Sequence, residues 1–282
     1  MRKPKKDILP QSEREWLETG KFTIRTVSIL GNRIRYTVTN SVDTDLLVTM
    51  VGGIPRDPNR RSRLPLINKL YGLMATKLVD HSVNSVLYNQ PATGGSSGDW
   101  DSETITSRSK TLVSLIEHTG NSTGCSKHTL IGASAGAYMA VKATDLLKGT
   151  KNKIDKLLLI SPAAYPLEIE NEPYGENFSK IVRAPWDVAN SPMFSRLERF
   201  VLEGGSLLIS FFEADDPPIP RYIQHYYCEF ARKLISRNHD VQLITIPGVA
   251  HNFRRINTSE KGNVVDNDSI RSTAEEFVRF IL

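Results

Sequence analysis

Two hydrophobic patterns alternate along most of this chain. Short apolar runs are separated by longer stretches with apolar residues at helical spacing. The predicted strands lie at 21–30, 33–39, 45–51, 84–89, 127–133, 154–161, 205–212 and 240–246. The predicted helices lie at about 64–79, 103–118, 136–148, 220–236 and 268–282. Because the later strands are apolar on both faces, they need helices on both sides, which predicts a layered α/β protein.

The first two predicted strands differ from the others because only Gly31 and Asn32 separate them. This pair favours the positive φ of a tight hairpin turn. The later strands are separated by helices, which is typical of parallel pairing. We therefore predict a mainly parallel eight-stranded sheet with helices on both faces. Residues 1–20 are interpreted as an N-terminal extension. Residues 21–282 are interpreted as a single domain, since no linker or change in composition divides this range.

The composition is that of an ordinary globular protein, with 39% hydrophobic and 24% charged residues. A chain of 282 residues can bury a sizeable core without disulfides or metals. Its two cysteines, Cys125 and Cys228, have no metal-ligand spacing. No stretch of 18 uninterrupted apolar residues is present, and no apolar segment follows the basic start of the chain. We expect a cytoplasmic protein that does not bind membranes.

A G-x-S-x-G sequence at 132–136 joins a predicted strand to a predicted helix. In parallel α/β sheets ligands bind outside the carboxyl ends of the strands, and this sequence lies at such an end. Its sharp turn lifts the serine oxygen out of the sheet edge, and the glycines avoid clashes with neighbouring backbone. An ordinary Gly/Ala/Ser turn is the alternative interpretation. The strand–turn–helix context favours Ser134 as a nucleophile.

A serine hydroxyl needs a base to take its proton. His251 follows the last predicted strand, where the order Ser…Asp…His places the base. The other histidines lie in helices, at helix ends or at the amino ends of strands. The acid that orients the imidazole is expected after strand 205–212, where Asp215 and Asp216 are adjacent. We prefer Asp216, because it lies four residues before Pro220, and Asp215 remains the alternative.

Two backbone N–H groups are needed to bind the oxyanion of the reaction. Ala135, directly after the serine, is one candidate. The other is Gly53, in the loop after strand 45–51, where glycine lets the backbone approach the substrate closely. An ordinary Gly-Gly turn is the alternative there. A second Gly/Ser loop at 90–98 lacks the Lys-Ser/Thr ending of a phosphate-binding loop and is interpreted as a structural turn.

From about residue 21 onward the chain resembles the α/β-hydrolase superfamily. The resemblance rests on four segments in the family's order: VGGIP at 51–55, GASAG at 132–136, EADDPPIP at 213–220 and PGVAHNF at 247–253. It implies the α/β-hydrolase fold and acyl-transfer chemistry. Many members begin the oxyanion loop with His-Gly, whereas this chain has Val51 and Gly52, so a side chain that often supports the loop is absent. Serine at 134 argues against the dehalogenases of the family, which have Asp there.

The 40 or so residues before strand 205–212 are too few for a cap domain, so we predict a short lid at about 165–203. Trp186 in this insert is the predicted substrate-binding residue, lining an acyl pocket. Arginines gather beside two of the predicted loops, and we interpret them either as attracting an anionic acyl substrate or as a solvated basic rim: Arg56, Arg60, Arg61, Arg63, Arg254 and Arg255.

The sequence therefore predicts a serine esterase or thioesterase with the triad Ser134, Asp216 and His251, acting on a small-molecule acyl substrate. This mechanism needs no metal and no organic cofactor. The formal charge of +5 is not gathered into a Lys/Arg stripe on any helix, which argues against a nucleic-acid partner. A lyase or cyclase on the same fold and a non-catalytic binding protein are the alternatives. Nothing in the sequence indicates the oligomeric state.

Overall fold

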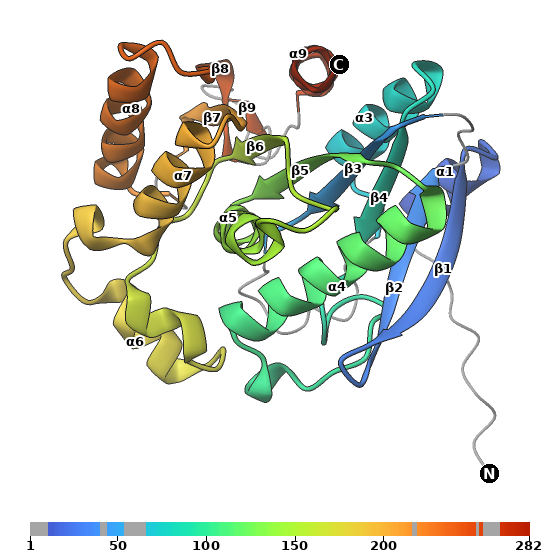
Figure 1. Cartoon of the computed structure of the whole chain (residues 1–282), viewed down its shortest axis with the longest axis horizontal. Coiled ribbons are helices and arrows are strands. Elements are labelled where there is room, and N and C mark those ends of the chain that lie inside the picture. The colour runs from blue at the N-terminus through green and yellow to red at the C-terminus, as the bar shows by residue number, and fades with distance from the viewer. Residues whose placement is uncertain (1–10, 40–43, 54–65, 216–218, 252–253, 256–265) are drawn as a thin grey trace.

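The computed structural model describes residues 11–39, 44–53, 66–215, 219–251, 254–255 and 266–282. These residues form one sheet with the strand order β1-β2-β4-β3-β5-β6-β7-β8-β9 (Figure 1). The strands are β1 Phe22–Ile29, β2 Asn32–Thr39, β3 Leu46–Val51, β4 Asn84–Tyr88, β5 Lys127–Ala133, β6 Lys156–Ile160, β7 Ser206–Ala214, β8 Val241–Ala250 and β9 Arg254–Arg255.

The six central strands, β4 to β8 in the sheet, are parallel. The hairpin of β1 and β2 joins them antiparallel, and β9 pairs antiparallel with the end of β8. The mainly parallel eight-stranded sheet predicted from the sequence is thus confirmed. The two-residue strand β9 is additional, and its pairing lengthens β8 to Ala250, four residues beyond the predicted end at 246.

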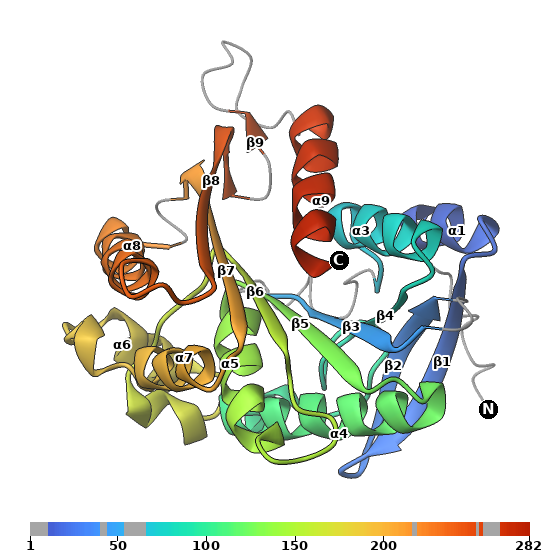
Figure 2. The ribbon, with the colours of Figure 1, turned by 45° about the horizontal axis from the view of Figure 1, so that its top comes forward.

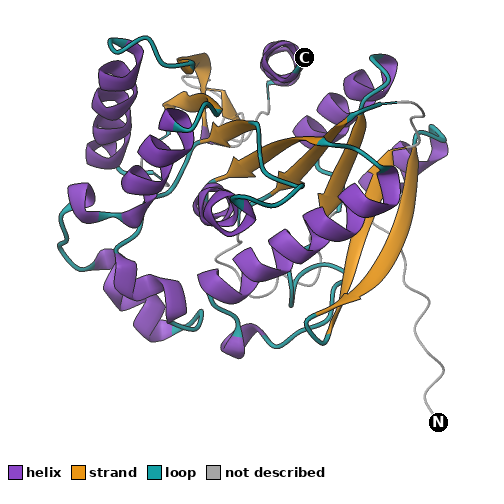
Figure 3. Cartoon of the chain, in the orientation of Figure 1, coloured by secondary structure: helices purple, strands orange, loops and turns teal. Residues whose placement is uncertain are grey.

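Helices cover both faces of the sheet, as Figures 2 and 3 show. One face carries α1 Gln11–Glu18, α3 Lys69–Asp80 and α9 Asn267–Ile281. The other carries α4 Ile105–Thr123, α5 Ala135–Leu147, α7 Pro192–Leu202 and α8 Arg221–Ile235. Between β6 and β7 the insert also contains α6 Glu176–Arg183 and the 3₁₀ turns η2 Leu167–Asn171 and η3 Val188–Asn190, while η1 Trp100–Ser102 precedes α4.

The hydrophobic core is divided into two layers by the sheet. In β6, Leu157 and Leu159 pack under α4, α5 and α7, while Leu158 and Ile160 pack under α3 and α9. Side chains of a strand alternate between its faces, so a strand buried on both sides must be apolar at every position. This is the physical reason for the continuous apolar runs in the sequence.

The ends of two helices show how local sequence and packing share control. Asn68 caps α3 by accepting a hydrogen bond from Tyr71 N–H (2.9 Å), so the helix starts at Lys69 and not at the predicted 64. Helix α4 runs to Thr123, beyond the predicted 118, and ends at Gly124, whose φ of 74° is the left-handed conformation of a helix C-cap.

The N-terminal segment and the insert are both fixed to the domain by buried charges. Glu13 of α1 is fully buried and pairs with Arg35 of β2 (2.7 Å). Glu170 of η2 accepts a hydrogen bond from Tyr138 Oη of α5 (2.8 Å) and pairs with Lys142 and Arg196. The insert predicted at about 165–203 is therefore anchored on α5, and its action as a lid stays a prediction.

Candidate active site

Ser134 occupies a strained turn between β5 and α5. Its φ of 53° and ψ of −123° are a rare conformation for a residue with a side chain. Three backbone hydrogen bonds hold it. Ser134 N–H donates to the Ile160 carbonyl (2.9 Å), and the Ser134 carbonyl accepts from Ala137 N–H (3.0 Å) and Ala163 N–H (3.2 Å). The residue is half-buried, so the strand–turn–helix junction presents it at the carboxyl edge of the sheet.

The glycines on either side of Ser134 allow the backbone to pack this closely. A Cβ added at Gly132 would lie 2.6 Å from Ala137 Cα, and one at Gly136 would lie 2.4 Å from the Gly52 carbonyl oxygen. Both distances are below van der Waals contact, and both neighbours are backbone, so no side chain could move aside. The G-x-S-x-G spacing is therefore a steric requirement of this turn.

His251 follows β8 directly, and its Nδ1 lies 2.5 Å from Asp215 Oδ1. The Asp215 side chain is completely buried, while about a fifth of the His251 side chain is exposed. Asp215 Oδ2 also accepts a hydrogen bond from Phe212 N–H (3.2 Å), and the Phe212 ring packs edge-on against the imidazole. The carboxylate is thus held from both sides and fixes the orientation of the imidazole.

Among the described residues, the carboxylate on His251 is that of Asp215, which the sequence left as the alternative. Its role as the acid of a triad stays a prediction. Asp216, preferred for its spacing to Pro220, lies outside the described residues. Strand β7 continues to Ala214 with an irregular register after Phe212, so Asp215 is the first residue beyond it. That irregularity depends on pairing with β8, which the spacing of residues along the chain does not reveal.

Gly53 lies beside the serine. A Cβ added to it would be 3.0 Å from Ser134 Cβ and 3.5 Å from Ser134 Oγ. Ala135 is the first residue of α5, and the first N–H groups of a helix have no partner within the helix. Both residues are placed next to the serine, and their roles as oxyanion donors stay predictions.

Two side chains that the sequence did not single out hold the loop that leads to Gly53. Gln90 Nε2 donates a hydrogen bond to the Gly52 carbonyl (2.7 Å), and Tyr71 Oη donates one to the Val51 carbonyl (3.2 Å). The Gly/Ser loop at 90–98 was interpreted as a structural turn alone. Because these contacts span 38 and 20 residues, no local signal in the sequence could have revealed them.

The other predicted site features are only partly described. Within the described residues, no hydrogen bond joins Ser134 Oγ to His251. Trp186 is partly buried against the core, so its contact with substrate stays a prediction. The arginines at 56, 60, 61 and 63 lie outside the described residues, and only the backbone of Arg254 and Arg255 is described, as β9.

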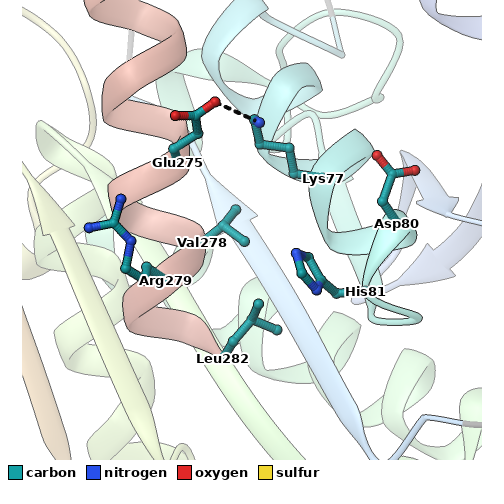
Figure 4. A pocket seen from close by; sticks show the side chains of 7 residues that line it. All are labelled: Lys77, Asp80, His81, Glu275, Val278, Arg279 and Leu282. Carbon is teal, nitrogen blue, oxygen red and sulfur yellow. Dashed lines mark hydrogen bonds and ion pairs between the residues drawn. The ribbon is translucent and has the colours of Figure 1, made fainter.

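A second surface feature lies at the amino ends of the strands, on the other side of the sheet's length from Ser134. A pocket of about 390 Å³ between the ends of α3 and α9 is lined by Lys77, Asp80, His81, Glu275, Val278, Arg279 and Leu282 (Figure 4). Its Lys77 pairs with Glu275 (2.9 Å). Three residues separate the end of helix α3 from the start of β4, so this pocket is at the amino ends of the strands, away from Ser134.

No group of three or more His, Cys, Asp or Glu side chains in the described ranges could hold a metal ion. Neither is any of the helices described long and apolar enough to cross a membrane. Cys125 is buried and Cys228 half-buried, and neither forms a disulfide.

Comparison with solved structures identifies the architecture. An α/β serine hydrolase without a lid from Xanthomonas campestris is 16% identical, with a TM-score of 0.54 over 82% of this chain and 86% of that one. An α/β serine hydrolase homologue from Coxiella burnetii is 14% identical, with a TM-score of 0.58 over 91% and 96%. Est1E from Butyrivibrio proteoclasticus with bound ferulic acid is 13% identical, with a TM-score of 0.62 over 90% and 98%. No family model and no curated protein sequence matches the chain.

Proposed function

We propose that this chain, which has the α/β-hydrolase fold, is a serine hydrolase that cleaves a carboxylic ester or a thioester through an acyl-enzyme. The observation that carries the proposal is the strained backbone of Ser134 in the turn between β5 and α5. Such strain costs on the order of 1–3 kcal/mol and persists where the surrounding structure imposes it. Its ψ of −123° also lies outside the left-handed helical region, which distinguishes this turn from the glycine C-cap of α4 at Gly124.

In the first half of the proposed reaction, His251 Nε2 takes the proton from Ser134 Oγ, and the oxygen attacks the carbonyl carbon of the substrate. The imidazolium that forms is stabilised by the carboxylate of Asp215, which is hydrogen-bonded to His251 Nδ1. The tetrahedral oxyanion accepts hydrogen bonds from the N–H groups of Gly53 and Ala135. The start of α5 adds the positive end of a helix dipole to the same place.

The intermediate collapses when His251 returns its proton to the leaving alkoxide or thiolate, which leaves an acyl group on Ser134. In the second half, His251 takes a proton from water, and the resulting hydroxide attacks the acyl carbon. The second tetrahedral intermediate breaks the bond to Oγ, and the serine regains its proton from His251. The products are a carboxylic acid and an alcohol or thiol, so atoms and charge balance without a cofactor.

The substrate class follows from the surroundings of the site. The insert after β6 contains Tyr165, Phe178 and Trp186, which are partly buried against the core. We propose that these side chains offer apolar surface to an acyl group. Among the structural neighbours, Est1E was solved with ferulic acid, and another is an arylesterase. We therefore propose a small-molecule ester or thioester, with aromatic acyl groups included among the candidates.

The test is turnover of a panel of p-nitrophenyl esters, feruloyl esters and acyl thioesters by the wild type and by Ser134→Ala. We expect the variant to lose at least about 10⁴-fold in kcat, because the nucleophile and its base act as one unit. A folded wild type that turns over no member of the panel, or a variant that retains activity, would contradict the proposal. Formation of a product without hydrolysis would indicate lyase or cyclase chemistry instead.

A further inference from the structure

A buried polar chain links the Gly52 carbonyl to helix α4. Gln90, at the end of β4, is 4% exposed and donates from Nε2 to the Gly52 carbonyl oxygen (2.7 Å). Its Oε1 accepts a hydrogen bond from Arg108 Nη1 of α4 (2.9 Å). Both the nitrogen and the oxygen of the Gln90 amide are therefore hydrogen-bonded. The amide connects the loop that contains Gly52 and Gly53 to the buried guanidinium of Arg108.

The contact on Gly52 bears on the neighbouring residue because a peptide group is planar and trans. The carbonyl of Gly52 and the N–H of Gly53 belong to the same peptide, and in a trans peptide they point in opposite directions. A hydrogen bond that holds the carbonyl therefore sets the direction of the Gly53 N–H. It also polarises that N–H, because hydrogen bonds in a chain strengthen one another. Gly53 is the residue beside Ser134.

Arg108 determines which way the Gln90 amide is turned. An arginine has only donors, so the group that faces it must be the oxygen Oε1, and Nε2 is left to face Gly52. In the reversed orientation, Gln90 Nε2 would face the N–H groups of Arg108, and Gln90 Oε1 would face the Gly52 carbonyl oxygen, so neither contact would be a hydrogen bond. The orientation of the donor on Gly52 is therefore imposed and does not depend on Gln90 alone.

Arg108 is itself fully buried and held by several groups. Its Nη2 donates to the Pro91 carbonyl (2.9 Å), and its Nε lies 3.8 Å from Glu103 Oε2. Its guanidinium carbon lies 4.6 Å from the ring centroids of both Trp100 and Tyr174. A buried charge is costly unless it is paired in this way, so the arginine is fixed with little freedom to turn.

From this arrangement we propose that Gln90 is a positioning residue, oriented by Arg108, which holds the Gly52–Gly53 peptide so that the Gly53 N–H is directed at the oxyanion formed at Ser134. Gln90 touches neither the substrate nor the reacting atoms. It takes the place of the supporting side chain that is absent at Val51. The proposal rests on the proposed function, because it assigns the Gly53 N–H a role in that reaction.

The test uses Gln90→Glu and Gln90→Met in the full chain. Glutamate keeps the size and the acceptor for Arg108 but has no N–H to donate to Gly52, and methionine removes both bonds. Loss of a direct oxyanion donor costs about 10²–10³ in kcat. For this indirect support we expect kcat to fall about 10- to 100-fold in both variants, with KM within about threefold of wild type. We expect Tm to fall by a few degrees in Gln90→Met, which leaves the buried Arg108 Nη1 without its acceptor, and to change less in Gln90→Glu, which keeps that acceptor.

A second readout separates positioning from a loss of structure. A trifluoromethyl ketone analogue of the best substrate forms a tetrahedral oxyanion with Ser134, whereas the product acid binds without one. We expect the ketone to lose affinity in parallel with kcat/KM, and the product acid to inhibit as in wild type. Gln242→Glu, which makes the same change at an exposed position at the start of β8, should behave as wild type.

The outcomes distinguish this proposal from the function on which it rests. If Ser134→Ala is inactive while both Gln90 variants keep kcat within about threefold, the positioning role is overturned and the serine hydrolase stands. A parallel fall in kcat, product-acid affinity and Tm would also overturn it, in favour of a purely structural role. If Ser134→Ala retains activity, the proposed function itself fails.

Discussion

The two edges of the same sheet place histidine in opposite settings. At the carboxyl edge, His251 follows β8, is partly exposed and is held by the buried carboxylate of Asp215. At the amino edge, His128 near the start of β5 is 1% exposed, and a Cβ added to Gly120 of α4 would lie 2.9 Å from its ring. Burial lowers the pKa of His128, although the nearby carboxylate of Asp155 acts in the opposite direction.

The difference follows from how a parallel sheet is built. At the carboxyl edge, strands end in turns that lead into helix N-termini, where N–H groups without partners and a positive dipole favour developing negative charge. At the amino edge, helices return to the strands, and the side chain of His128 is buried at one such junction. The contrast predicts that substitutions at the carboxyl edge change activity most, and that substitutions of anchoring or amino-edge residues change stability.

The largest expected effect is at the acid. Asp215→Asn should lower kcat by about 10³–10⁴-fold, because the amide favours the wrong tautomer of His251. Asp216→Asn should stay within about threefold of wild type, and both variants should remain folded by circular dichroism. Steady-state kinetics on the best substrate of the panel would decide between them. A large loss for Asp216→Asn with a small one for Asp215→Asn would assign the acid to the other residue.

A stability effect of intermediate size is expected at Glu170, which anchors the insert without contacting the Asp215–His251 pair. Glu170→Gln should cost about 2–3 kcal/mol of unfolding free energy at neutral pH, because it leaves Arg196 and Lys142 near a neutral amide. Urea unfolding followed by fluorescence measures this cost. The matched control is Glu168→Gln, an exposed glutamate of the same 3₁₀ turn.

The same variant has an expected pH dependence. Burial raises the pKa of Glu170, but hydrogen bonds from Arg196, Lys142 and Tyr138 lower it more, so the net pKa lies below the ordinary 4.5. A lowered carboxyl pKa contributes stability that is complete above the pKa of the unfolded chain and is lost as pH falls through the folded value. The difference between wild type and variant should therefore be constant above about pH 5 and shrink in acid. A constant difference down to pH 3 would contradict this origin.

The smallest effect is expected at His128. Because its pKa is lowered by burial from the usual 6.5, the unfolded chain binds the proton more tightly than the folded one. Its contribution to stability is complete above about pH 6.5 and is lost as pH falls through the lowered folded pKa. In His128→Leu this part of the acid sensitivity should disappear. Between pH 7.5 and pH 5, the Tm of the variant should therefore fall by a few degrees less than the Tm of the wild type, and kcat should be retained. The exposed His81→Gln is the control, and an unchanged Tm profile in His128→Leu would remove the assigned cause.

Secondary structure was predictable where one local rule controls it. Continuous apolar runs marked the central strands, and turn chemistry predicted the first hairpin. The predicted turn pair, Gly31 and Asn32, was wrong by one residue, because Leu30 and Gly31 form the turn and Asn32 already pairs with Ile29. The steric needs of the turn at Ser134 explain why its glycines were already informative in the sequence. Helix starts were less certain, as at α3, because several polar residues could act as the cap and packing selects one.

What the sequence by itself determined is the layered α/β architecture, the serine turn and the histidine after the last long strand, since each depends on residues close together along the chain. The tertiary structure decided that Asp215 meets His251, because that contact depends on the strand irregularity after Phe212 and on the extension of β8 by β9. It also decided that Gln90, which is hydrogen-bonded to Arg108, contacts the Gly52 carbonyl next to Gly53. Such contacts join residues far apart in sequence, and their geometry is set by the packing of the whole sheet and its helices.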